Sequence, residues 1–375
     1  MNKRVKRLLF VVVYGAMMLL FVELGLQAFY FVTAKQTLFS RVGLPIYVPD
    51  DHVVFRLKPN LERKHNTTEF QSTIYTNSEG IRVSGEHEEY ELDPGDSVYR
   101  ILLLGPSFAF GWGVDFEDSF GALLEEYLEA EGFADGKDVE IINAGIPSSP
   151  PQFQLEGYKH YWNKYDPDLV ISFIYGSMSL SEEHPEKYAV NEQGYLIRNM
   201  SAARRLQLAL KKSAIVFYSW VIYTRLRPPD ADDGTVIGAG RELSLQAAFD
   251  PANAEAMASL RHYEALRNAV DEGRSDLLIL YLPLSYCVHR GDVARWRHLG
   301  VRDVDSQIEF DGAFCDYLGQ QGFDCLNITE DLVRQTADTQ DRLYYWLDIH
   351  WTPYGNRVAA RAAARHLLAR RASVP

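Results

Sequence analysis

A nearly unbroken run of apolar residues at positions 8–34 constrains the fold of this chain more than any other feature. At ~1.5 Å per residue, a helix over this run is about 40 Å long, which is enough to cross a bilayer core with some tilt. Glu23 and Gln27 interrupt the run and lie four positions apart, so they share one helical face, where they meet a partner or extend toward the interface. The run therefore predicts one transmembrane helix at 8–34.

The charges around this run predict its orientation. Basic residues are concentrated at positions 1–7, whereas only Lys35 and Arg41 follow the run closely. The positive-inside rule then predicts a cytoplasmic tail at 1–7 and a periplasmic or extracellular location for the residues beyond about 35. A cleaved signal peptide is the alternative, because Val32 and Ala34 are small residues at a suitable place. The apolar core exceeds the ~7–15 residues usual for a signal peptide, which favours an uncleaved, single-pass signal-anchor in the cell membrane.

A second apolar stretch lies at 214–223, and basic residues precede and follow it. It is too short to span a bilayer. Two interpretations remain open, a buried helix and a helix on the membrane surface.

Composition and charge exclude several classes of protein. Apolar residues make up 47% of the chain and charged residues 24%, as in ordinary globular proteins. The net charge of -13 argues against a general nucleic-acid binder, which needs a basic surface. We therefore expect a folded domain with no nucleic-acid partner.

The three cysteines do not match a metal or redox motif. Cys287, Cys315 and Cys325 lack the spacing of zinc sites and of C-x-x-C motifs, and the histidines show no metal-ligand spacing. Cys315 and Cys325 either pair outside the cytoplasm or remain free buried thiols together with Cys287. We expect no metal site.

Alternating strands and helices predict an α/β fold with a mainly parallel sheet. A lead-in segment at 35–97 is expected to pack on a main domain at 98–375, which contains a helical insertion at about 185–272. The final helix should begin after Thr352-Pro353, since Thr is a preferred N-cap and Pro a preferred first residue. Asp118 is the expected N-cap of an earlier helix. The expected strands lie at 98–104, 139–142, 168–175, 277–282 and 323–328, and the expected helices at about 119–128, 152–162, 251–272 and 303–321.

Polar residues follow several of these strands, where active sites of parallel sheets lie. Ser107 follows the first strand, and His350 with Asp348 precedes the last helix. A serine hydroxyl needs an adjacent base to act as a nucleophile, and an imidazole held by a carboxylate supplies it. The pattern predicts acyl transfer with Ser107 as nucleophile, His350 as base and Asp348 as its orienting acid, while the amides of Ser107 and Gly145 stabilise the oxyanion.

Three short tracts around these residues resemble the sequence blocks of SGNH/GDSL hydrolases. Residues 105–114, G-P-S-F-A-F-G-W-G-V, resemble the first block, G-D-S-F-T-x-G-x-G-V. Residues 142–146 resemble the second block, whose glycine lends an oxyanion amide, and residues 348–356 resemble the last block. Asn77-Ser78-x-Gly80-x-Arg82 resembles the lead-in of membrane-anchored bacterial members. The D-x-H-W-T-P run is also similar to alginate O-acetyltransferase-type domains.

The resemblance implies a flavodoxin-like three-layer sandwich, the SGNH hydrolase fold. It also implies hydrolysis or transfer of ester-linked acyl groups, chiefly acetyl, without a metal or other cofactor. With a membrane anchor, the expected substrate is an acylated small molecule or a cell-envelope or secreted polysaccharide, and polysaccharide export proteins are expected partners.

Two residues depart from the family pattern. Pro106 stands where the first block has Asp, although the amide of Ser107 survives this change. Ser177 stands where the third block has an oxyanion-donating Asn, and its shorter side chain can donate one hydrogen bond. These departures support an alternative hypothesis, a catalytically inactive domain that binds glycan or an assembly partner.

Overall fold

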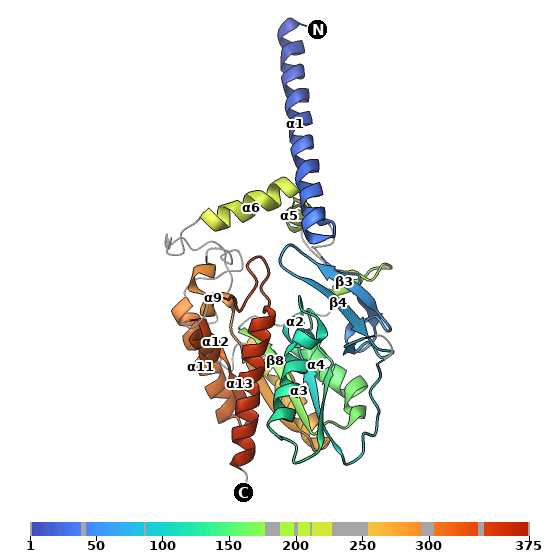
Figure 1. The fold of residues 1–375 in the computed structure, drawn as a ribbon, viewed down its shortest axis with the longest axis vertical. Helices are drawn as coiled ribbons and strands as arrows, with labels where there is room; N and C mark the ends of the chain where they lie inside the picture. Colours follow the sequence, from blue (N-terminus) through green and yellow to red (C-terminus); the bar gives the residue numbers. More distant parts are fainter. Residues whose placement is uncertain are drawn as a thin grey trace.

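The computed structural model places one long helix on top of an α/β body (Figure 1). It describes residues 2–38, 43–85, 88–176, 188–198, 202–210, 212–226, 254–293, 304–336 and 341–373. Helix α1 (Lys3–Ala34) carries the N-terminus at its free end, and the C-terminus lies at the opposite end of the molecule. Within the described part of the chain, α1 is the one helix long and apolar enough to cross a membrane.

An eight-stranded sheet forms the centre of the body, in the order β12-β11-β8-β6-β7-β5-β4-β3. The strands from β12 to β7 are parallel, and their order is the flavodoxin-like 2-1-3-4-5, which confirms the predicted fold class. These parallel strands are β6 (Val98–Leu104), β7 (Asp138–Asn143), β8 (Leu169–Tyr175), β11 (Asp276–Leu282) and β12 (Asp324–Asn327).

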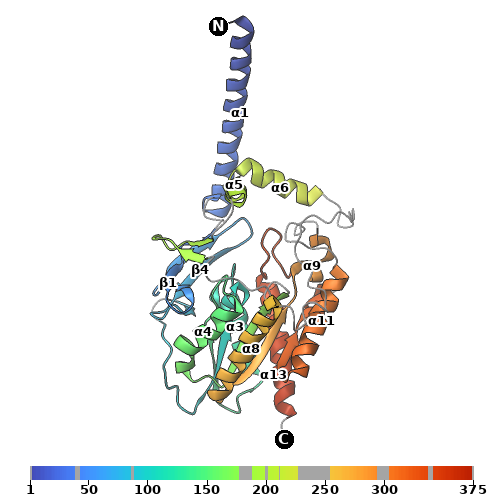
Figure 2. The same ribbon diagram turned by 180° about the vertical axis from the view of Figure 1, so that it is seen from behind.

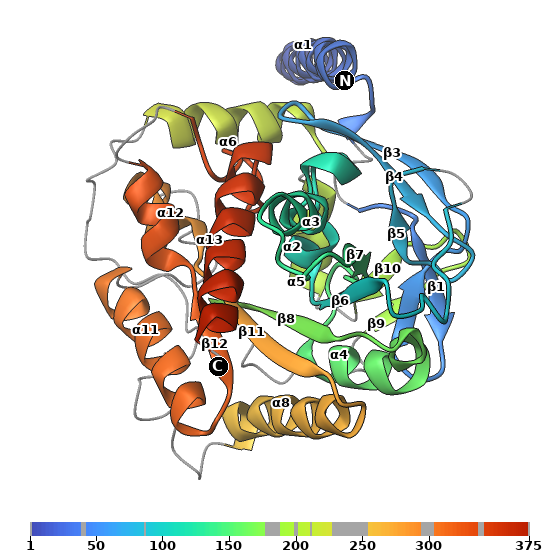
Figure 3. The same ribbon diagram turned by 60° about the horizontal axis from the view of Figure 1, so that its bottom comes forward.

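Helices cover both faces of the sheet, because alternate residues of each parallel strand are buried on opposite sides. In β6, Ile101 and Leu103 join one core cluster, whereas Leu102 and Leu104 join the other. Figures 2 and 3 show α4 and α8 on one face, and Figure 3 shows α3 and α13 on the other. The helices of the body are α2 (Ser107–Phe110), α3 (Phe120–Ala130), α4 (Pro151–Gly157), α8 (Ala254–Glu272), α9 (Ser285–Val288), α11 (Val304–Gln320), α12 (Thr329–Thr336) and α13 (Pro353–Ala372).

The lead-in segment joins the body by strand pairing as well as by packing. Its strands β3 (Glu62–Asn66), β4 (Gln71–Thr76) and β5 (Arg82–Val83) extend the sheet as an antiparallel edge, and Arg82 pairs with Asn143 of β7. Outside the main sheet, β1 (Tyr47–Asp50) pairs with β2 (Val54–Leu57), and β9 (Tyr188–Val190) with β10 (Leu196–Arg198). Through the pairing of Arg82 with Asn143, the lead-in segment reaches the carboxyl end of β7, beside the predicted site.

One of the two predicted helix N-caps is confirmed and the other is wrong. Thr352 caps α13 as predicted, since its hydroxyl accepts a hydrogen bond from the Gly355 amide at 3.1 Å. The prediction that Asp118 caps α3 is wrong: Ser119 is the cap, and Asp118 belongs to a short 3-10 turn. Cys315 and Cys325 form a disulfide, with 5.5 Å between their Cα atoms, and Cys287 is a buried free thiol.

Candidate active site

Ser107 lies directly beyond the carboxyl end of β6, at the first position of α2. Gly105 makes this turn with a φ of +151°, and a Cβ there would lie 2.6 Å from the Cβ of Phe173. Only glycine therefore fits between the end of the strand and the nucleophile. Because Ser107 begins the helix, its amide has no acceptor within that helix.

The structure brings Ser107, His350 and Asp348 together. Ser107 Oγ lies 2.5 Å from His350 Nε2, and His350 Nδ1 forms a hydrogen bond with Asp348 Oδ1. The His350 amide also donates to Asp348 Oδ1 at 3.1 Å. His350 is only 8% exposed, so its ring is held between its two partners and away from bulk water. This is the geometry in which an imidazole can take the proton of a serine hydroxyl.

Asp348 is ionised in this arrangement. Burial alone would raise its pKa, but the charge of His350 and hydrogen bonds from the His350 ring and amide outweigh burial and lower the pKa to about 2. A carboxylate at this position favours the tautomer with a proton on Nδ1, which leaves Nε2 as the acceptor that faces Ser107.

His350 and Asp348 belong to the acid–base loop, residues 341–352, which folds back on itself. The Tyr345 amide donates to the His350 carbonyl, and the Thr352 amide donates to the Leu343 carbonyl, both at 3.0 Å. The Thr352 hydroxyl, which caps α13, also donates to the Arg342 carbonyl at 2.6 Å. Residues 346–350 thus form the tip of a closed loop that is fixed to the start of α13.

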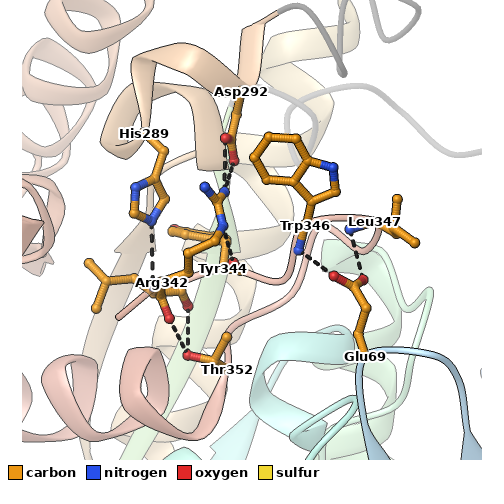
Figure 4. A network of polar contacts seen from close by, with 9 residues as sticks. Glu69, His289, Asp292, Arg342, Tyr344, Trp346, Leu347 and Thr352 are labelled. Atoms are coloured by element: carbon orange, nitrogen blue, oxygen red, sulfur yellow. Dashed lines mark hydrogen bonds and ion pairs between the residues drawn. The ribbon is translucent and has the colours of Figure 1, made fainter. Parts of the chain in front are cut away.

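Side chains from both flanks hold this loop (Figure 4). On one flank, Arg342 donates to both carboxylate oxygens of Asp292, at 2.6 and 2.8 Å. On the other flank, Glu69 from the β3–β4 turn accepts hydrogen bonds from the amides of Trp346 and Leu347, each at 2.7 Å. Glu69 therefore holds the backbone directly before Asp348.

The nucleophile loop, residues 105–114, is held from beneath by Arg82. This fully buried guanidinium donates to the carbonyls of Phe110, Gly111 and Val114, the last two at 2.5 and 2.6 Å. Burial lowers the pKa of Arg82 to about 10, so the side chain remains a cation at neutral pH. Arg82 is part of the lead-in motif at residues 77–82, but the sequence did not predict a role for its side chain.

The two predicted oxyanion residues beyond Ser107 remain predictions. The Gly145 amide donates to Asn143 Oδ1 at 3.1 Å, and a Cβ at Gly145 would come within 2.4 Å of the Phe110 amide nitrogen. Close packing beneath α2 therefore requires this glycine. Ser177 lies outside the described residues. Asn143, which the sequence did not single out, also donates to the Ala109 carbonyl at 2.9 Å.

Aromatic side chains line His350. Trp112 lies 5.8 Å from His350, and the buried His65 lies 4.4 Å from Trp112, between ring centroids. Burial lowers the pKa of His65 to about 4, and the charge of His350 adds to this effect while Asp348 opposes it. His65 is therefore neutral at pH 7. No sequence signal separated it from a surface residue, because β3 is otherwise polar.

Across the described ranges, no group of three or more His, Cys, Asp or Glu side chains is arranged to hold a metal ion.

One family model matches part of the chain. Residues 242–374 match the family model of the SGNH hydrolase-like domain, acetyltransferase AlgX. No curated protein matches the chain.

Several solved structures are similar at low identity. A lipase/acylhydrolase from Enterococcus faecalis is 13% identical, with 72% of this chain and 96% of that chain covered and a TM-score of 0.35. A catalytic mutant of Axe2, an acetylxylan esterase from Geobacillus stearothermophilus, is 12% identical, with 72% and 94% covered and a TM-score of 0.38. The matched residues include the acid–base loop and α13, and over this part of the chain the resemblance predicted from the sequence is confirmed.

Proposed function

We propose that this chain is a membrane-anchored, extracytoplasmic serine esterase or O-acyltransferase that acts on ester-linked acyl groups. The observation that carries the proposal is the contact of 2.5 Å between Ser107 Oγ and His350 Nε2, with Asp348 on the opposite ring nitrogen. The buried His350 and the ionised Asp348 support it further.

The reaction proceeds in two halves. His350 Nε2 accepts the hydroxyl proton of Ser107 as Oγ forms a bond to the acyl carbon, and the carbonyl oxygen becomes an oxyanion. The Ser107 amide is placed to stabilise that charge, and one such donor typically contributes ~3–4 kcal/mol. The tetrahedral intermediate then collapses, the ester C–O bond breaks, and the departing alcohol takes the proton from His350.

The second half removes the acyl group from Ser107. His350 deprotonates an incoming hydroxyl, which attacks the acyl carbon, and the proton returns to Ser107 Oγ as the acyl–serine bond breaks. Water as the incoming group gives hydrolysis, and a sugar hydroxyl gives transfer. We propose acetyl as the acyl group because the matched family model is that of an acetyltransferase. We propose a cell-envelope or secreted polysaccharide as the substrate because the proposed membrane anchor would hold the enzyme at the cell envelope.

The membrane location is part of the same proposal. Helix α1 has an apolar window that is 0% buried within the molecule, and basic residues precede it. An uncleaved anchor with the N-terminus inside places the domain on the periplasmic or extracellular side. Polysaccharide export proteins in the same membrane are the proposed partners.

The test is hydrolysis of p-nitrophenyl acetate by the full-length chain in detergent, beside Ser107→Ala. We expect release of p-nitrophenol by the wild type and a rate for the variant near that of the buffer. Equal rates for the two proteins would overturn the proposal and favour the inactive, binding-only domain.

A further inference from the structure

Glu23 and Gln27 of α1 hold the start of a second apolar helix, α6 (Ala214–Leu226). One carboxylate oxygen of Glu23 accepts a hydrogen bond from the Ala214 amide at 2.7 Å. The other accepts from the Ile215 amide at 3.0 Å and from the Ser213 hydroxyl at 2.8 Å. Gln27 donates to the Lys212 carbonyl at 2.9 Å. The first amides of α6, which need acceptors outside their own helix, thereby find one on α1.

Apolar packing completes this joint. Tyr30, Ala34 and Leu38 bury against Ala214 and Phe217, and the rings of Tyr30 and Phe217 meet edge to face at 5.5 Å. Preceding α6, the short helix α5 (Ala202–Leu210) lies at the same level (Figure 1). The position of α6 on α1 is therefore set by both hydrogen bonds and buried side chains.

The opposite side of α6 is exposed and, apart from Ser219, apolar. Val216, Ile222, Tyr223 and Leu226 are between 40% and 78% exposed, and Arg225 is the one charged residue of the helix. In a water-soluble helix this side would be polar. Figures 1 and 2 show α6 running across the direction of α1, as a helix in the plane of a membrane would run.

The level of α6 along α1 matches the edge of a bilayer. Glu23 lies 15 positions after Leu8, where the apolar run begins, which is about 22 Å along the helix axis. A hydrocarbon core of ~30 Å that begins at Leu8 ends about 8 Å beyond Glu23. Interfacial helices lie at a depth of ~5–10 Å in the headgroup and acyl boundary, so α6 begins at this depth.

The carboxyl end of the parallel strands, where Ser107 lies, is called the catalytic edge of the sheet. This edge lies next to α6. Leu347, beside Asp348, packs against the cluster formed by α1 and α6. The Asn66 amide at the β3–β4 turn donates to Gln36 Oε1 at 2.9 Å, beyond the end of α1. In Figure 1 the acid–base loop and α2 are on the side of the body that faces α6.

From these observations we infer that α6 lies in the outer interface of the bilayer that α1 spans, with Val216, Ile222, Tyr223 and Leu226 against lipid. This second contact turns the catalytic edge toward the membrane, so that substrate reaches Ser107 along the bilayer surface. The inference rests on the proposed membrane anchor.

The experiment places an environment-sensitive fluorophore on single cysteines in the full-length chain, reconstituted in vesicles of phosphatidylcholine and phosphatidylglycerol. Ile222→Cys and Leu226→Cys probe α6, Leu19→Cys probes α1, and Glu129→Cys probes the body. The wild type, whose free Cys287 is buried, reports background labelling. Lipids with a nitroxide near the headgroup or at the acyl end then quench each probe according to its depth.

We expect the headgroup nitroxide to quench about half of the emission at positions 222 and 226, as for a helix ~5–10 Å deep, and the acyl-end nitroxide to quench position 19. Position 129 should remain bright. Quenching at 19 with none at 222 or 226 would overturn the role of α6 and leave the anchor intact. No quenching at 19 would overturn the anchor itself. Energy transfer between copies labelled at 222, without lipid quenching there, would overturn the inference in favour of a second copy on this face.

Discussion

The nucleophile loop and the acid–base loop are joined by the Ser107–His350 hydrogen bond and by a hydrogen bond from the Tyr345 hydroxyl to the Gly113 carbonyl, but they are held in different ways. The nucleophile loop continues a buried strand, packs closely on Phe173 and Gly145, and is braced by the buried Arg82. The acid–base loop comes from the C-terminal part of the chain. It is positioned by hydrogen bonds that it donates to Glu69 and Asp292, by its own backbone hydrogen bonds, and by buried side chains such as Trp351. Changes beneath the nucleophile should therefore cost stability, whereas changes around the base should cost rate.

The largest effect on rate is expected for Asp348→Asn. The amide can present an N–H to His350 Nδ1, which favours the wrong tautomer and removes the base from Ser107. We expect kcat/KM for p-nitrophenyl acetate to fall on the order of 10⁴-fold, with a Tm in detergent close to that of the wild type. A loss below about ten-fold would show that Asp348 does not control the base.

For the nucleophile side, Arg82→Met should destabilise the fold. The carbonyls of Phe110, Gly111 and Val114 would lose their shared donor while remaining buried, at a cost of about 3–5 kcal/mol. Thermal unfolding followed by circular dichroism should show a much lower Tm, and Arg82→Lys should fall between the two. An unchanged Tm for Arg82→Met would break the distinction between the loops.

His65, whose ring contacts Trp112, should make the folding stability of the chain depend on pH. Its pKa is lowered from 6.5 to about 4 in the folded state, so between these values the unfolded chain binds more protons and folding stability falls as the pH falls. The contribution of His65 across this window is about 3 kcal/mol. His65→Phe should flatten the Tm profile between pH 6.5 and 4. An equally steep profile in the variant would assign the dependence to other groups.

The smallest effect is expected for Glu69→Gln. Glutamine offers one acceptor oxygen to the two amides of Trp346 and Leu347, so the backbone before Asp348 should shift slightly. Small misplacement of a catalytic group is costly, and we expect kcat to fall about ten-fold with little change in Tm. Glu129→Gln, on an exposed part of α3, is the matched control. A lower Tm with an unchanged kcat would make Glu69 a residue of the fold rather than a positioning residue.

The places of the candidate site residues in the fold could be predicted from the sequence because these residues lie in short local patterns. Ser107 follows an apolar strand, and His350 precedes a Thr-Pro helix start. The location of each residue relative to its strand or helix could therefore be predicted from local sequence alone. The alternation of apolar strands with helices likewise predicted the parallel part of the sheet.

The supporting contacts could not be predicted in the same way. Strand β3 is polar and β5 has two residues, so neither carries a recognisable periodicity. Strand β5 joins the sheet by pairing with the distant β7, and β3 joins it only through β4. Glu69 and His65 act through neighbours hundreds of positions away. The Asp118 error has a local cause, since Ser119 could cap the same helix one position later.

The most direct test of the account is reaction of the full-length chain with a fluorophosphonate, followed by mass spectrometry of its peptides. We predict stoichiometric modification of Ser107, at a rate that falls on the order of 10³-fold or more in His350→Ala, because the hydroxyl then lacks its base. Modification that spares Ser107, or that proceeds equally fast without His350, would contradict the assignment of these residues as nucleophile and base.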